Sequence, residues 1–287
     1  MILVTGATGH VGNAVVSRLV SSGHEVAALV RKPEAAQRRL PQTKALRFGD
    51  YEDASALKAA FAGIDGLVLI SSDGAADAVM RHHANAITAA TAAGVRHITF
   101  TSIIDVDETS PFYYASAYRD AERRLAASGV PSTILRCGLY SDFIRDTWLV
   151  PASRELVLPA GQGLVAPISR DDVAAAVAAV ATRTDATRAL YTITGNQPLG
   201  FEAITALYAD VTGQPLRYRP CSPADYLASA SARLEKPWPE AFATLCASIA
   251  EGRYASTPSD FITLTGKPPE SFRDFVVRVA LGMQTDG

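Results

Sequence analysis

The segment Ile2-Leu3-Val4-Thr5-Gly6-Ala7-Thr8-Gly9-His10-Val11-Gly12 decides the fold of this chain of 287 residues. An apolar, β-branched run leads into a turn with the spacing G-x-x-G-x-x-G, and a helical pattern follows. Gly6 permits a tight exit from the strand, Gly9 lets the backbone approach a pyrophosphate, and Gly12 lets the helix pack close to the strand. The helix N-terminus adds unpaired N–H groups and the positive end of its dipole.

The segment therefore predicts a strand, a turn and a helix that bind the phosphates of a dinucleotide. We expect six contacts within the turn: Gly6, Thr8, Gly9, His10, Val11 and Gly12. A glycine-rich turn that has lost its ligand has the same composition, but the strand before this turn and the helix after it favour binding.

The rest of the first half alternates short apolar runs with longer, Ala-rich helical patterns. Strands are predicted at Met1–Thr5, Glu25–Val30, Ala45–Phe48, Gly66–Ile70, His97–Thr101 and Ser132–Arg136. Helices are predicted at Gly12–Ser22, Ala54–Ala62, Ala75–Ala93 and Tyr114–Ser128. The strands are apolar throughout, as expected where helices cover both faces of a sheet. The pattern predicts an α/β fold whose first domain, residues 1–150, is a Rossmann-type doubly wound parallel sheet.

After Arg136 prolines interrupt the chain repeatedly, and the elements become shorter. Helices are predicted at Arg170–Ala181, Phe201–Thr212, Pro223–Ala232 and near Glu270–Leu281, with strands at Leu156–Leu158, Ala189–Thr194 and Leu216–Arg219. This half predicts a smaller C-terminal α/β lobe, residues 151–287, that forms a substrate cleft with the first domain. Some of its segments can return to the main sheet.

Composition excludes several classes of function. The net charge of −2 gives no electrostatic footprint for nucleic acid or an anionic membrane, and the apolar runs are too short to span a bilayer. Cys137, Cys221 and Cys246 lie far apart without metal-ligand spacing, which predicts no metal site and suits a reducing cytoplasm. Because Met1 leads straight into a strand, we expect no signal peptide.

The end of the second predicted strand, Val30-Arg31-Lys32-Pro33, indicates which of NAD(H) and NADP(H) the site prefers. A site for NAD places an acidic residue here to bind the ribose 2′-hydroxyl, and this strand end has none. Arg31 can bind a 2′-phosphate through its planar guanidinium, and Lys32 adds a second charge. The pattern therefore favours NADP(H) over NAD(H), with a solvated basic loop as the alternative.

Polar residues follow the next three strands, at the sheet edge where ligands bind in open α/β folds. Asp50 can accept a hydrogen bond from the adenine amino group beside Tyr51, or it can instead cap the helix that begins at Ala54. The hydroxyl groups after the fourth and fifth strands are expected to face the cofactor, with loop capping as the alternative. They belong to Ser71, Ser72, Thr101 and Ser102.

Taken in order, several motifs resemble the atypical short-chain dehydrogenase/reductases, specifically the NmrA-like group, which includes type 2 NAD(P)H:quinone oxidoreductases and triphenylmethane reductases. They are Thr5–Gly12, Val30–Pro33, Gly49–Tyr51, Gly94–His97, Ser128–Arg136, Ile168–Ala174 and Val211–Pro215. The first motif is shared by the whole superfamily, whereas the ordered set is more specific. The resemblance implies a Rossmann domain with a small C-terminal lobe and a substrate cleft between them.

The chain departs from the Tyr-x-x-x-Lys motif of ordinary short-chain dehydrogenases. It has Tyr114-Ala115-Ser116-Ala117-Tyr118, with a tyrosine at the lysine position. Without a nearby cation, Tyr114 is expected to titrate near its reference pKa of about 10, which makes it a poor base but still a hydrogen-bond donor. Tyr114 and Tyr118 are the catalytic candidates, and the alternative is that both only pack.

Three aromatic residues after the sixth strand, Tyr140, Phe143 and Trp148, are expected to line a substrate pocket, although they can equally be core contacts between the lobes. His82 and His83 are expected to be exposed, and Glu122 to lie on a solvated helix face. Asp171 and Asp172 are expected to favour the start of a helix through its dipole.

These patterns together predict an NADPH-dependent oxidoreductase. Its acceptor is expected to be a quinone-like or other electron-poor small molecule, since such acceptors need less acid catalysis than a ketone. The alternative is a non-catalytic dinucleotide-binding sensor of the NmrA type, which the missing Tyr-x-x-x-Lys motif favours. An isomerase or epimerase with bound NAD is a weaker possibility, because Arg31 opposes it.

Overall fold

The computed structural model describes residues 1–32, 36, 39, 40, 43, 45–149, 154–183 and 189–282. Its centre is a seven-stranded parallel sheet with the strand order β3-β2-β1-β4-β5-β6-β9. The strands are β1 (Ile2–Val4), β2 (Val26–Val30), β3 (Ala45–Phe48), β4 (Gly66–Leu69), β5 (His97–Ile103), β6 (Ser132–Cys137) and β9 (Leu190–Ile193). The order reverses direction at β1, as in a doubly wound sheet, so the predicted fold class is confirmed.

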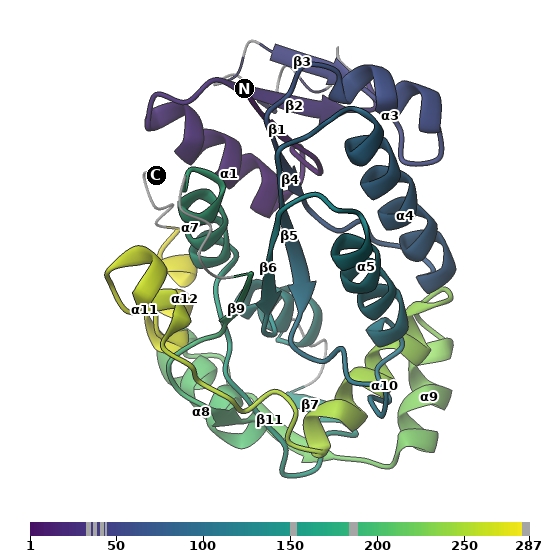
Figure 1. The fold of residues 1–287 in the computed structure, drawn as a ribbon. Helices are drawn as coiled ribbons and strands as arrows, with labels where there is room; N and C mark the ends of the chain where they lie inside the picture. The colour runs from purple at the N-terminus through teal and green to yellow at the C-terminus, as the bar shows by residue number, and fades with distance from the viewer. Residues whose placement is uncertain are drawn as a thin grey trace.

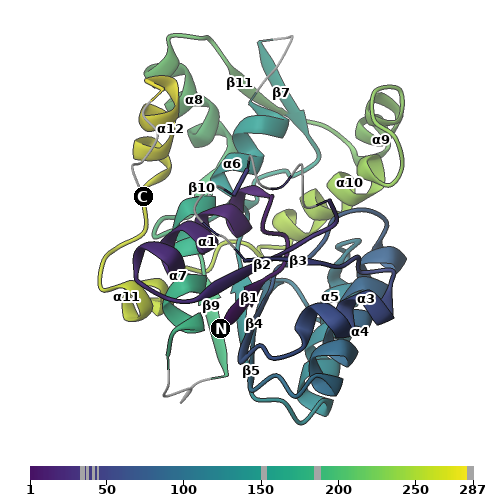
Figure 2. The ribbon, with the colours of Figure 1, turned by 90° about the horizontal axis from the view of Figure 1, so that it is seen from above.

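Helices cover both faces of this sheet (Figures 1 and 2). They are α1 (His10–Ser21), α3 (Ala54–Phe61), α4 (Ala76–Ala92), α5 (Ala115–Ala127) and α7 (Arg170–Ala181). Helices α1 and α7 pack against each other on one face, and α3, α4 and α5 form a row on the other.

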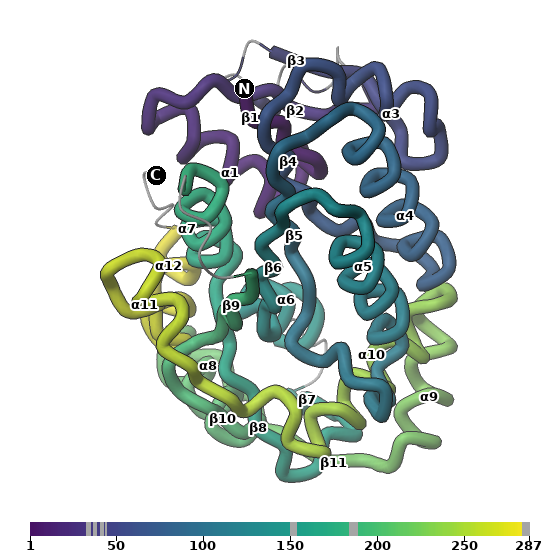
Figure 3. The backbone as a smooth tube through the Cα atoms, in the orientation of Figure 1, coloured from purple at the N-terminus to yellow at the C-terminus, as the bar shows by residue number. Residues whose placement is uncertain are grey.

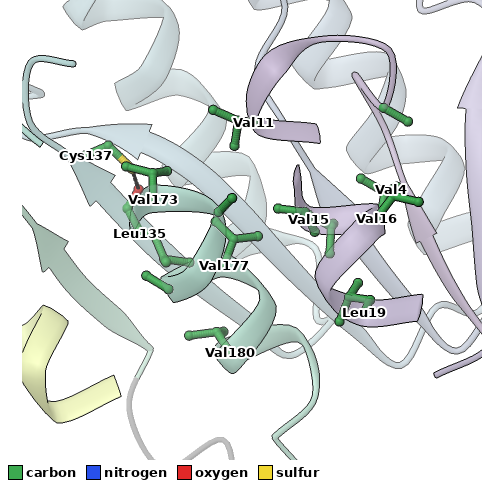
Figure 4. Close-up of a cluster of buried hydrophobic side chains, with 14 of the residues drawn as sticks. Val4, Val11, Val15, Val16, Leu19, Leu135, Cys137, Val173, Val177 and Val180 are labelled. Atoms are coloured by element: carbon green, nitrogen blue, oxygen red, sulfur yellow. Dashed lines mark hydrogen bonds between the residues drawn. The ribbon is translucent and has the colours of Figure 1, made fainter. Parts of the chain in front are cut away.

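The α1–α7 side of the sheet is a close-packed aliphatic layer. Val15 and Leu19 of α1 approach Val173 and Val177 of α7 in Figure 4, and each of these four side chains is at most 1% exposed. Burying such a side chain contributes roughly 1.5–3 kcal/mol. This layer fixes the N-terminus of α1, and therefore the glycine turn, against the sheet.

Most of the remaining elements gather beyond the carboxyl ends of the strands, as the trace in Figure 3 shows, while α11 (Asp260–Thr265) lies beside the sheet. The others are α6 (Ser141–Phe143), η1 (Ile144–Trp148), β7 (Glu155–Leu158), β8 (Leu164–Val165), β10 (Leu199–Gly200), α8 (Phe201–Thr212), β11 (Arg217–Pro220), α9 (Pro223–Ser231), α10 (Trp238–Ala250) and α12 (Phe272–Ala280). A separate core holds many of them together, centred on Phe201, Phe272 and Phe275.

Two of the late elements join the main sheet: β9 forms its edge, and α11 packs on β9 and α7. The expected boundary between residues 150 and 151 lies outside the described residues, as does Pro33. Helices α10 and α11 are missing from the sequence prediction. Prolines 237 and 239 obscure α10, but they flank its first residue, Trp238, where a missing N–H costs no helical bond.

Candidate functional site

One long cleft of about 1020 Å³ runs along the carboxyl ends of the strands, from the glycine turn to α10. It collects residues from the ends of β1 to β6 and from the C-terminal half of the chain. The sequence candidates on its wall are Gly6, Thr8, Gly9, His10, Val11, Gly12, Arg31, Asp50, Tyr51, Ser71, Ser72, Thr101, Ser102, Tyr118, Tyr140 and Phe143. The cleft therefore joins residues that sequence reasoning assigned to two separate tasks.

The glycine turn is shaped by close backbone contacts. Gly6 has a φ of +58°, which favours glycine, and its carbonyl accepts the N–H of Gly9 at 2.9 Å. A Cβ on Gly12 would lie 2.2 Å from the oxygen of Gly6, so only glycine fits there. Gly9, the N-cap of α1, offers no side chain, and the first turn of this fully described helix holds no acidic residue. The N–H groups of this helix start, which no side chain caps, therefore fit a pyrophosphate.

The wall beyond β2 and β3 is polar. Arg31 is exposed and lines the cleft, whereas Lys32 is exposed beside it and stays a predicted second contact. Asp50 accepts the N–H of Glu52 at 3.0 Å, and Asp53 is the residue that caps α3, through bonds from the backbone of residues 55 and 56. Asp50 does not cap the helix, so its carboxylate can serve a ligand.

The histidines of α4 hold the two serines that follow β4. His83 Nε2 lies 2.9 Å from Ser71 Oγ, and His82 Nδ1 lies 2.8 Å from Ser72 Oγ. His82 also reaches Glu52 Oε1 at 3.0 Å and stacks on Tyr51. The expectation that both histidines are exposed is wrong, because α4 folds back over the strand end that precedes it. Burial lowers the pKa of His83 to about 4, so its ring is neutral at pH 7.

The structure separates the two tyrosines at the catalytic motif. Tyr118 lines the cleft, with its ring against those of His83 and Phe100. Tyr114 does not line it, and its hydroxyl donates to the carbonyl of Gly74 at 2.5 Å. Burial raises the pKa of Tyr118 to about 12 and that of Tyr114 further still, which corrects the expectation of an ordinary pKa for Tyr114.

The far end of the cleft is aromatic. Phe143 lies on its wall, and its ring centroid is 5.3 Å from that of Phe242. Trp148 does not line the cleft: it is 5% exposed and packs between Phe143 and Phe201 in the C-terminal core. Its assignment to the pocket is therefore corrected, because its ring is buried against Phe143 and Phe201.

Sequence reasoning missed several residues on this wall: Phe112, Leu234, Trp238, Phe242, Leu245 and Tyr254. Most belong to α10 or its neighbours, far from the strands in sequence. The aromatic residues of the 238–254 segment were the available signal.

Tyr140 and Arg170 lie together on the cleft wall, between the aromatic end and the carboxyl ends of the strands. The Arg170 guanidinium lies 5.7 Å from the Tyr140 ring centroid and 3.5 Å from Asp146 Oδ2. Burial raises the pKa of Tyr140 well above its usual value, so this phenol stays protonated. The two aspartates after Arg170 lie in the first turn of α7, and Asp172 accepts the N–H of Glu270, which is a structural role.

Ser102 is hydrogen-bonded to helix α5. Its Oγ donates to Glu122 Oε1 at 2.7 Å, and the same carboxyl group pairs with Arg136. Glu122 is 13% exposed and so does not lie on a solvated face, contrary to expectation.

The described part of the chain offers neither a metal site nor a membrane-spanning helix. It contains no group of three or more His, Cys, Asp or Glu side chains placed to hold a metal ion. None of the helices in those residues combines the length and the apolar character that crossing a bilayer requires.

Comparison with known proteins places this cleft in a family. A family model described as NAD(P)H-binding matches residues 6–184. The chain is 35% identical to Quinone oxidoreductase 2 of Escherichia coli (strain K12) over 234 residues, 80% of each chain. It is 32% identical over 280 residues, 96% of each, to a (4-alkanoyl-5-oxo-2,5-dihydrofuran-3-yl)methyl phosphate reductase of Streptomyces griseus. The structure of Citrobacter sp. triphenylmethane reductase complexed with NADP(H) matches with a TM-score of 0.87 at 29% identity, covering 98% of this chain and 100% of that one.

Proposed function

The chain belongs to the NAD(P)H-binding family, within its NmrA-like, atypical short-chain dehydrogenase/reductase group, and from this premise we propose that it is an NADPH-dependent oxidoreductase whose acceptor is a quinone-like or other electron-poor small molecule. The observation that carries the proposal is the single cleft that joins the glycine turn to an aromatic wall. A dinucleotide and a flat acceptor can therefore share one cleft.

The cofactor end of the cleft fits NADP(H). The backbone of the glycine turn would hold the pyrophosphate, Arg31 the 2′-phosphate and Asp50 the adenine amino group. When bound, the nicotinamide supplies a hydride. The relatives named above include a reductase complexed with NADP(H), which supports this choice over NAD(H).

The acceptor end supplies flat apolar walls and neutral hydroxyl donors. Phe143 and Phe242 offer faces and edges for an aromatic acceptor, and such ring pairs contribute about 0.5–1.5 kcal/mol beyond burial. Tyr118 is the donor to the acceptor oxygen in this proposal, because it lines the cleft and its raised pKa keeps its proton in place. A donor that does not ionise suits an acceptor whose reduced oxygen is already a stable anion.

Two further proposals follow from the same observations. The three cysteines are free, which supports a cytoplasmic location.

The C-terminal core that includes Phe201 supports a lobe of its own beside the Rossmann domain, over residues 151–287, with β9 and α11 returned to the main sheet.

The test is NADPH oxidation by the purified protein with a panel of quinones, triarylmethane dyes and simple ketones. We expect turnover with the first two classes and little with ketones. Tight NADPH binding with no acceptor reduced would instead favour a dinucleotide sensor.

A further inference from the structure

The proton of Ser102 is directed away from the cleft. Ser102 lies at the carboxyl end of β5, is 2% exposed, and donates to Glu122 Oε1 at 2.7 Å. Arg136, its partner across β5 and β6, donates to both oxygens of the same carboxyl group, from Nε at 3.0 Å and from Nη2 at 2.6 Å. Because Glu122 is 13% exposed, water competes weakly for these bonds.

The number of protons and lone pairs on the Ser102 hydroxyl then decides whether it can donate or accept a hydrogen bond with a ligand. A serine hydroxyl has one proton and two lone pairs, and a carboxylate that binds arginine in this bidentate way can only accept. The proton of Ser102 is therefore committed to Glu122, and a lone pair is what remains for the cleft.

We propose that Ser102 accepts a hydrogen bond from the carboxamide N–H of the nicotinamide, and that Glu122 and Arg136 are positioning residues that impose this polarity. The inference rests on the proposed function, since it requires a nicotinamide dinucleotide in the cleft. Ser102 touches the cofactor, whereas Glu122 and Arg136 act through Ser102.

The strand order supports this position. Arg31 and Asp50 place the adenosine over β2 and β3, so the nicotinamide half falls on the other side of β1, over the ends of β4, β5 and β6. The other hydroxyls there have different partners: Ser71 and Ser72 bind histidines, and Thr101 Oγ1 accepts the N–H of Ser71 at 3.2 Å. Among these four described residues, Ser102 is the one whose side chain donates to a carboxyl group.

The chain supplies a matched control. Glu122 and Arg136 also line a second cavity of about 760 Å³, on whose wall Glu108 pairs with Arg123. That second ion pair is exposed and bonds to no residue of the cofactor cleft. Glu108→Gln therefore removes the same charge from the same surface without touching Ser102.

The experiment is calorimetric titration of the full chain with NADP⁺ and with its 3-acetylpyridine analogue, in which a methyl group replaces the carboxamide nitrogen. One neutral hydrogen bond corresponds to about a two- to tenfold preference for NADP⁺ in the wild type. Ser102→Ala should reduce this preference to about one, and Ser102→Thr should retain it. Glu122→Gln should also abolish it, because the new amide can donate to Ser102 and turn the hydroxyl proton toward the cleft. Glu108→Gln should leave it unchanged.

Equal binding of the two dinucleotides by the wild type, or an unchanged preference in Ser102→Ala, overturns the inference while the cofactor site stands. Failure of the wild type to bind either dinucleotide overturns the proposed function and this inference with it. Should Glu122→Gln not fold, Ser102→Ala and Ser102→Thr decide the matter, because they leave the ion pair in place.

Discussion

The two ends of the cleft differ in whether backbone or side-chain groups line them. At the cofactor end the predicted pyrophosphate contacts are backbone groups: Gly6 has a positive φ, Gly12 leaves no room for a Cβ, and the helix start supplies N–H groups. At the acceptor end the contacts are side chains, such as Phe143 and Phe242, which approach from separate segments of the chain.

The difference lies in what each end can tolerate. A backbone cradle has one shape, so a single added atom can destroy it, and the same cradle serves any reaction that uses the dinucleotide. A wall of aromatic side chains can change one ring at a time, with a modest cost for each. We therefore expect the cofactor end to tolerate little change, and the acceptor end to decide which acceptor is reduced. The following predictions are ordered from the largest expected effect to the smallest.

Gly9→Asp should abolish NADPH binding while the fold survives. Gly9 is an N-cap in an extended conformation that any residue can adopt, and aspartate is a favoured N-cap residue, so helix α1 should not lose stability. Its carboxylate would nevertheless lie against the pyrophosphate. Fluorescence titration with NADPH and a thermal melt measure the two effects. Gly9→Ser is the matched control, since it caps the helix without the charge and should bind more tightly than Gly9→Asp. Unchanged affinity in Gly9→Asp would show that the cofactor site is misplaced.

Tyr118→Phe should lower kcat by about 10²- to 10³-fold for an acceptor that develops charge on oxygen, because one aimed donor is lost. The loss should be smaller for a quinone whose reduced form is a stable anion. Cofactor affinity should stay the same. Tyr114→Phe, one helical turn away, should leave kcat unchanged, since that hydroxyl bonds to Gly74 outside the cleft. Steady-state kinetics on both acceptor classes provide the measurement, and equal kcat in the two variants would reduce Tyr118 to a packing residue.

Arg31→Ala should weaken NADPH far more than NADH. A hydrogen bond to a charged group contributes roughly 1.5–3 kcal/mol, which corresponds to about a 10- to 150-fold loss for the phosphorylated cofactor. Lys32→Ala removes a neighbouring charge that does not line the cleft, so it should cost much less. The dissociation constants of both cofactors with both variants are the measurement. Losses of the same size for NADPH and NADH would mean that Arg31 does not contact the 2′-phosphate.

The same contrast between the two ends explains which site residues could be predicted from the sequence. The turn and Arg31 lie within one strand–turn–helix–strand unit, so spacing alone predicts their positions. Tyr114 and Tyr118 are one helical turn apart, and only the packing of α5 shows which of them faces the cleft. His82 was misjudged because its partner Ser72 is brought to it by the fold of α4 over β4.

The acceptor end was the least predictable part of the site. Phe143 is the N-cap of the π-helical turn η1 and Trp148 is its last residue, and no periodicity in the sequence predicts that one lines the cleft and the other the core. Phe242 arrives from α10, about a hundred residues later, through long-range packing of the C-terminal core.

The smallest effect is expected from that aromatic wall. Phe242→Ala should raise KM for flat aromatic acceptors by about 2- to 12-fold, because one ring contact contributes roughly 0.5–1.5 kcal/mol, and it should leave NADPH affinity unchanged. Trp148→Phe is the contrasting variant: it changes a buried core ring of similar chemistry, so it should lower the melting temperature without altering the relative KM values of a dye and a small quinone. If Phe242→Ala changed kcat for every acceptor equally, the wall would be acting on the reacting centre rather than on acceptor choice. The proposed division between a fixed cofactor end and an adaptable acceptor end would then be wrong, because one ring would serve both.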